Sequence, residues 1–224
     1  MNRSHHHLAT VLLLAGIASG CARPIAVTTA TPSVPAAPLV APDSFRVAFE
    51  TSVGRFDVVA RRDLAPIGVD RFHELVTERY YDGARFFRVV PGFVVQFGLA
   101  ADSATTAAWH ERKLPDDSVR ASNVRGAISF AHAGPGTRSV QLFINLADNP
   151  KLDTLGTVGF PPIGAVADSG MAVVDAIFSG YGEGAPRGAG PEQSRISREG
   201  EAYLAREFPR LDRILTARIV AEWP

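Results

Sequence analysis

The stretch FFRVVPGFVVQ, residues 86–96, is the most informative part of the chain. One cation, Arg88, sits inside a nearly continuous apolar run. Side chains of a strand alternate between two faces, so Arg88 and Phe87 lie on opposite faces. The same alternation places Val94 and Gln96 on a shared face. A lone arginine in a strand is more often a surface residue whose stem covers apolar neighbours. The neighbouring strands are therefore needed to decide whether Arg88 is a surface residue or a functional one.

Two later segments supply such neighbours, ISFAHAGPGT at residues 128–137 and QLFIN at residues 141–145. Strand alternation places Leu142 and Ile144 in the core and Phe143 on the outer face. An outer face that carries arginine, glutamine and phenylalanine is unusual for a purely structural sheet. We therefore expect these segments to form a binding surface.

Around these segments the pattern is one of many short strands and few helices, which indicates a closed antiparallel barrel in a single domain over residues 44–224. The predicted strands are 45–49, 56–59, 86–90, 93–97, 126–131, 141–146 and 214–220. The predicted helices are one from Pro66 that Gly83 ends, one over 171–179 with Ser169 as its cap, and one over 199–207. The last belongs to a helical insertion at about 192–208, before the final strand.

Composition excludes several classes of function. Lys+Arg and Asp+Glu are both 23 in the 224 residues, and this balance argues against a nucleic-acid groove. A single cysteine rules out an internal disulfide and a Cys-rich zinc site. The histidines at 73, 110 and 132 have no metal-ligand spacing, so no metal and no cofactor are expected. The glycines of 182–190 lack the Lys-Ser/Thr helix start of a phosphate loop, which favours a surface loop.

The amino terminus has the anatomy of a signal peptide over residues 1–20, with an apolar run of about ten residues that is too short to span a bilayer. Small residues directly before Cys21 resemble the lipobox of bacterial lipoproteins, in which the cysteine is lipidated. Ordinary secretion with cleavage nearby is the alternative. Residues 21–43 then form a Pro-rich linker. We expect a lipid-anchored, periplasm-facing protein of a bacterial envelope, and Ala22 slightly favours the outer membrane.

The two central segments resemble the active-site signatures of cyclophilins, an F-x-R-x-x-P-G-F-x-x-Q run followed by S-M-A-N-A-G-P-x-T and a Q-F-F-I strand. The resemblance extends over about residues 45–180. It implies an all-β fold, an eight-stranded antiparallel barrel closed by two helices with the groove on its outer surface. The matching residues are Arg88, Pro91, Gly92, Phe93, Gln96, Ala131, Ala133, Gly134, Pro135, Thr137, Gln141 and Phe143.

The resemblance implies a peptidyl-prolyl cis–trans isomerase, monomeric, acting on proline-containing polypeptides. The X–Pro bond rotates over a barrier of ~18–20 kcal/mol, and in the twisted state the prolyl nitrogen regains a lone pair. Arg88 would donate a hydrogen bond to that nitrogen, and Gln96 would orient Arg88. The implied substrate-binding residues are Phe93, Val94, Phe143 and Leu152 for the proline ring, with Ala131, His132, Ala133 and Gln141 for the peptide.

Four departures from the family pattern lie in this region, and one is the absence of the usual histidine from residues 157–160. His132 replaces the usual asparagine, Val94 stands where methionine is common, and Lys151 takes the place of a tryptophan beside Leu152. The main alternative is a non-catalytic proline-peptide binding or chaperone module on the same scaffold, because fold does not fix function. A binding module has no need to keep both Arg88 and Gln96, which favours the enzyme.

Overall fold

The computed structural model describes residues 40–224. The predicted signal peptide, the lipidation residue Cys21 and nearly all of the predicted linker lie outside the described residues. Among the helices from residue 40 onward, none is long and apolar enough to cross a bilayer.

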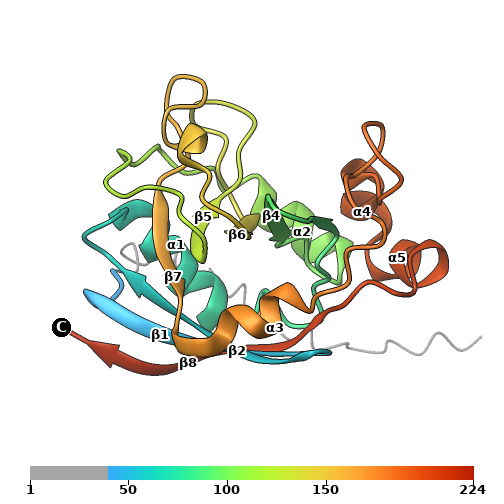
Figure 1. The fold of residues 1–224 in the computed structure, drawn as a ribbon, viewed down its shortest axis with the longest axis horizontal. Coiled ribbons are helices and arrows are strands. Elements are labelled where there is room, and N and C mark those ends of the chain that lie inside the picture. Colours follow the sequence, from blue (N-terminus) through green and yellow to red (C-terminus); the bar gives the residue numbers. More distant parts are fainter. Residues whose placement is uncertain (1–39) are drawn as a thin grey trace, which may run out of the picture. The chain divides into compact units, whose positions relative to one another are not determined.

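The strands form one eight-stranded antiparallel sheet in the order β3-β4-β6-β5-β7-β2-β1-β8, which confirms the predicted fold class (Figure 1). Alternate side chains of a strand point into the core, and on β1 Phe45, Val47 and Phe49 are accordingly all fully buried. The strands are β1 (Ser44–Thr51), β2 (Gly54–Arg61), β3 (Arg88–Val90), β4 (Val94–Phe97), β5 (Ala127–Phe130), β6 (Leu142–Asn145), β7 (Pro162–Val166) and β8 (Ile214–Trp223).

The sheet curls until its two ends meet. The segment that precedes β3 pairs with the start of β8: the Gly83 N–H donates to the Ile214 carbonyl at 2.9 Å, and the Ile214 N–H donates to Ala84 at 2.8 Å. Arg85 and Arg213 form an antiparallel bridge beside these bonds. The curled sheet thereby protects edges that a flat sheet would leave unpaired.

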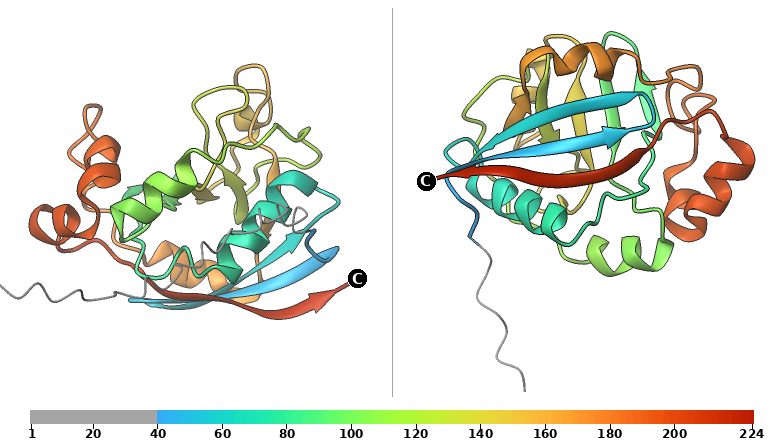
Figure 2. Two further views of the ribbon diagram at one scale, coloured as in Figure 1. Left: turned by 180° about the vertical axis from the view of Figure 1, so that it is seen from behind. Right: turned by 90° about the horizontal axis from the view of Figure 1, so that it is seen from below.

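Two helices cover the apolar face of the sheet. Helix α1 (Pro66–Thr77) buries Val69, Phe72 and Leu75 on one stripe, as its three-to-four-residue spacing predicts. In the right-hand view of Figure 2, helix α3 (Met171–Asp175) lies beside β2 and α1 lies beside β8, with strands β2, β1 and β8 between the two helices. Helix α3 is shorter than predicted, and the predicted cap is wrong: a 3-10 turn, η2 (Asp168–Gly170), precedes the helix, whose N-cap Gly170 has no side chain.

Two elements lack a readable pattern and were not predicted. Strand β7 begins at the second of two prolines, which is tolerated only at the first residue of a strand or at an edge. Helix α2 (Ser103–His110) buries only Thr106, so it has no apolar stripe. Its start is set by Asp102, whose carboxylate accepts from the Thr105 N–H at 2.8 Å.

The predicted insertion contains two helices, α4 (Gln193–Glu199) and α5 (Glu201–Glu207), with Gly200 between them at φ +60°. They pack on the barrel in a second apolar cluster, formed by Phe87, Leu99, Ile196, Tyr203, Leu204 and Leu211. Arg85, which is 7% exposed, donates to Glu201 and to the Leu211 carbonyl. The insertion is therefore fixed to the barrel edge by an apolar core and by an ion pair whose arginine is buried.

Candidate functional site

A groove of about 730 Å³ runs over the outer face of β4 and β6. All ten residues that the sequence predicts for catalysis and peptide binding line this groove. They are joined there by residues that it did not predict. The predicted lining residues are Arg88, Phe93, Val94, Gln96, Ala131, His132, Ala133, Gln141, Phe143 and Leu152, and the others are His110, Lys113, Thr137, Ser139, Leu155, Phe160, Arg187 and Gln193.

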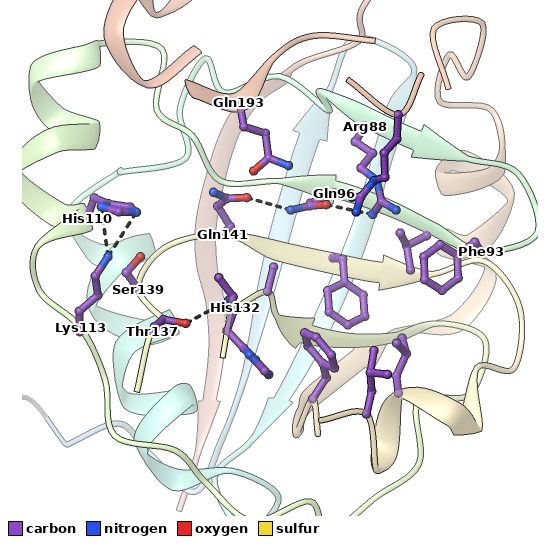
Figure 3. A pocket seen from close by; sticks show the side chains of 18 residues that line it. Arg88, Phe93, Gln96, His110, Lys113, His132, Thr137, Ser139, Gln141 and Gln193 are labelled. Atoms are coloured by element: carbon purple, nitrogen blue, oxygen red, sulfur yellow. Dashed lines mark hydrogen bonds between the residues drawn. The ribbon is translucent and has the colours of Figure 1, made fainter. Parts of the chain in front are cut away.

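A row of polar side chains crosses the groove (Figure 3). Strand register places Arg88 opposite Gln96, and Gln96 opposite Phe143. The Arg88 Nη1 donates to Gln96 Oε1 at 3.1 Å, and Gln96 Nε2 donates to Gln141 Oε1 at 2.8 Å. Gln96 thus has its carbonyl toward the guanidinium and its amide nitrogen toward Gln141, so it connects the cation to the peptide-binding side of the groove.

An unpredicted carboxylate completes the surroundings of Arg88. Glu183 accepts from Arg88 Nε at 2.6 Å and from Nη2 at 2.7 Å, a bidentate ion pair. The hydrogen bonds from Arg88 lower the pKa of Glu183 from its ordinary value, against the opposing effect of burial. Glu183 belongs to the Gly-rich loop that follows α3, and its 95-residue separation from Arg88 leaves no local signal.

The apolar end of the groove is a small separate core. Val94, Phe143 and Leu152 are each less than a tenth exposed, and Phe93, Ala131 and Phe160 pack against them. The Arg88 guanidinium carbon lies 5.5 Å from the centre of the Phe93 ring. The cation therefore stands at the rim of a pocket that is large and apolar enough for a proline ring.

His132 and Phe160 form one wall of the groove. Their rings stack with centres 4.1 Å apart, and Phe160 meets Phe143 edge-on at 5.6 Å. His132 Nδ1 accepts from the Gly134 N–H at 3.1 Å, which assigns the ring hydrogen to Nε2, 2.6 Å from the Gly159 carbonyl. The resemblance implies that His132 helps to bind the peptide, and in the structure its side chain also holds this wall in place.

A buried polar network supports the apolar pocket from behind. The Asn123 Nδ2 donates to the Phe160 carbonyl at 2.9 Å, while Asn123 Oδ1 accepts from Ser129 and Asn145. Asn149 Nδ2 donates to the Phe93 carbonyl at 3.0 Å. The bonds to the Phe160 and Phe93 carbonyls tie two groove residues to side-chain amides, which fixes the shape of the pocket.

The opposite end of the groove is polar and basic. The Lys113 Nζ lies 3.1 Å from Nδ1 of His110, the last residue of α2. Gln193, at the start of α4, points toward Gln141 and Gln96 (Figure 3). His110 ends the unpredicted helix, Lys113 follows it, and Gln193 belongs to the insertion. Over the range 40–224, no group of three or more His, Cys, Asp or Glu side chains could hold a metal ion.

Comparison with known proteins links the chain to one family. The family model "Cyclophilin type peptidyl-prolyl cis-trans isomerase/CLD" matches residues 46–197. The peptidyl-prolyl cis-trans isomerase ppi1 of Schizosaccharomyces pombe is 35% identical over 115 residues, 50% of this chain and 74% of that protein. A peptidyl-prolyl cis-trans isomerase of Helicobacter pylori is 36% identical over 117 residues, 52% of this chain and 69% of that protein.

Solved structures show a similar fold. The crystal structure of a cyclophilin type peptidyl-prolyl cis-trans isomerase from Cryptosporidium parvum superimposes with a TM-score of 0.57 at 19% identity, covering 80% of this chain and 99% of the other. A second crystal structure of that protein, in the presence of the dipeptide Ala-Pro, gives a TM-score of 0.56.

Proposed function

The chain belongs to the cyclophilin-type peptidyl-prolyl cis–trans isomerases, and we propose that its groove accelerates X–Pro rotation by stabilising the twisted amide through Arg88. The observation that supports this mechanism most is the setting of Arg88. Its guanidinium is held by Glu183 and Gln96 at the rim of an apolar pocket. A catalyst of this reaction needs no nucleophile, only a site that binds the twisted amide better than either planar form.

The number of donors fits this role. A guanidinium carries five N–H groups, and the hydrogen bonds to Glu183 and Gln96 use three of them. Two N–H groups, one on Nη1 and one on Nη2, are left for a bound peptide. The prolyl nitrogen accepts a hydrogen bond only when the amide twists and resonance is lost, so this bond lowers the barrier without tightening ground-state binding.

Substitution of Arg88 by alanine tests the mechanism. Loss of one charged donor to a transition state costs ~3–4 kcal/mol, which predicts a fall in kcat of about 10²–10³-fold. The rate is measured with a protease-coupled assay on an X–Pro peptide, and folding is checked by circular dichroism. Arg61→Ala, an exposed arginine on β2 outside the groove, is the matched control and should keep full activity. A folded Arg88→Ala protein with unchanged kcat would contradict the mechanism.

A binding module that does not catalyse is the second candidate. It predicts that the native protein binds a proline peptide and leaves its isomerisation rate unchanged. The family membership and the polar row Arg88–Gln96–Gln141 favour catalysis. The same coupled assay, run with the native protein, separates the two candidates.

We further propose that the substrates are folding or unfolded proteins of a bacterial cell envelope. The support is the sequence of the amino terminus, where small residues precede Cys21 after a short apolar run and a Pro-rich segment follows. In this proposal a lipid on Cys21 tethers the enzyme and the linker gives the groove its reach.

A further inference from the structure

The ion pair between Arg88 and Glu183 is more enclosed than a surface salt bridge. The Arg88 side chain is 13% exposed and that of Glu183 is 28% exposed. Glu183 binds the Nε–Nη2 edge of the guanidinium in the fork geometry that suits a carboxylate. With Gln96 on Nη1, the guanidinium plane is held from two directions.

The Gly-rich loop is built around Glu183. The Gly184 N–H donates to Glu183 Oε1 at 3.0 Å, and the Gly190 N–H donates to the Glu183 carbonyl at 2.8 Å. A Cβ on Gly188 would lie 2.3 Å from that carbonyl oxygen, so only glycine fits there. Gly188 and Gly190 thereby let the chain pass close to the backbone of Glu183.

The loop is held in turn by the insertion. Tyr181, two residues before Glu183, packs edge-on against Phe208 at 5.0 Å and adjoins the second apolar cluster. Glu183 is thus carried by an anchored segment of the chain and lies at a fixed distance from β3.

Two opposite effects of Glu183 on catalysis have to be weighed. The negative charge of Glu183 weakens the positive potential that Arg88 exerts on the twisted amide. Against this, a free arginine carries about 2 kcal/mol of rotamer entropy, which it would lose on aligning with the substrate. A hydrogen bond weakens steeply once its angle departs from linearity, so alignment of the donor matters more than the net charge of the pair.

We propose that Glu183 is a positioning residue for the isomerisation reaction, holding the Arg88 guanidinium so that its two remaining N–H groups face the bound prolyl amide. The proposal rests on the proposed role of Arg88. Glu183 does not line the groove, and in this proposal it acts through Arg88; its other ion-pair partner, Arg187, lies 3.8 Å away and is 78% exposed. The Gly-rich loop and the insertion are then parts of the active site, because they determine where Glu183 lies.

The test uses the full-length protein with Glu183→Gln, which keeps the size of the side chain but removes its charge. We expect kcat to fall about tenfold while KM for the X–Pro peptide stays within twofold. Asp63→Asn is the matched control, since it also removes a carboxylate charge from a bidentate pair with an arginine but lies outside the groove, the Gly-rich loop and the insertion. Its kcat should equal that of the native protein.

Two further measurements separate positioning from a merely structural role. In an Arg88→Ala background, Glu183→Gln should cause no additional loss of kcat, because Glu183 acts only through Arg88. The NMR signal of the Arg88 Nε–H, assigned by its loss in Arg88→Ala, should be sharp in the native protein and broadened by exchange in Glu183→Gln. Gly188→Ala moves the Glu183 backbone without changing any charge and should lower kcat in the same direction.

The outcomes distinguish this proposal from the proposed function. Full activity of a folded Arg88→Ala protein would overturn both. Low activity of Arg88→Ala together with unchanged or higher activity of Glu183→Gln would overturn the role of Glu183 alone. An additional loss of kcat from Glu183→Gln in the Arg88→Ala background would also overturn it.

Discussion

Single residues in the groove combine a packing role with a chemical one. Phe160 illustrates this, because it stacks on His132, meets Phe143 edge-on, and has its carbonyl held by the buried Asn123. Its ring is partly exposed, so it presents a surface to ligand while its backbone is fixed. We therefore expect Phe160 to act in binding the proline ring and not in the rotation step.

Phe160→Ala should raise KM for an X–Pro peptide about tenfold and leave kcat nearly unchanged. The reason is the loss of an aromatic contact and of buried apolar area, together worth ~1.5 kcal/mol. Initial rates over a range of peptide concentrations give both constants. Phe160→Leu, which keeps most of the apolar volume, is the control and should show a smaller rise. An unchanged KM in Phe160→Ala would contradict the assignment of Phe160 to the proline pocket.

At the scale of elements, the meeting of the two ends of the sheet holds the fold together. Asp82, in the turn after α1, joins this turn to β8. It accepts from Arg218 Nη1 at 2.8 Å, from Arg218 Nη2 at 2.7 Å, and from the Ala217 N–H at 3.1 Å. Burial raises the pKa of Asp82, but the hydrogen bonds from Arg218 and Ala217 outweigh it, and the net pKa is lowered.

This carboxylate should make the closure sensitive to acid. Because the folded pKa of Asp82 lies below its unfolded value, its stabilising contribution is fully present above about pH 4 and is lost as the pH falls through the folded pKa. Asp82→Asn should lower the free energy of unfolding by ~1 kcal/mol at pH 7, a modest value because Arg218 is 37% exposed.

Urea unfolding of both proteins at pH 7 and pH 3 checks this expectation. The difference in free energy between native and Asp82→Asn protein should shrink at pH 3. An equal difference at both pH values would show that the charge of Asp82 contributes nothing to the closure. Asp63→Asn, at an exposed ion pair with Arg61, serves as the control and should change stability less at either pH.

At the scale of the whole molecule, segments far apart in the chain build one groove. Strands β3, β4 and β6 supply its floor, α2 and the insertion supply its polar end, and the segment around Phe160 supplies one wall. The proposed tether at Cys21 lies outside the described residues and stays a prediction.

Cys21→Ser tests the tether. If Cys21 is lipidated, the substitution should move the protein from the membrane fraction to a soluble or uncleaved form, because one residue carries all of the acyl chains. The isomerase activity of the folded domain should not change. Labelling cells with a clickable palmitate provides the measurement: label on the native protein and none on Cys21→Ser supports lipidation. Absence of label from both proteins would indicate ordinary secretion.

The sequence by itself determined seven of the eight strands and the floor of the groove. Alternation along 86–97 and 141–146 separates the core residues Val89 and Ile144 from the outward Gln96 and Phe143, because the two-residue period of a strand is a local property. The resemblance to cyclophilins then named the ten groove residues that these strands and their loops carry.

Only the tertiary structure decided what surrounds them. Glu183 contacts Arg88 across a separation of 95 residues. Phe160 stacks on His132 from the segment before β7, a strand whose prolines hide its pattern in the sequence. Such contacts depend on where the insertion docks and how the sheet closes. Both depend on packing between distant apolar clusters, and no periodicity along the chain encodes it. The expected role of Arg88 could therefore be inferred from its neighbours in the sequence. Its orientation is set by Glu183, which only folding brings next to it.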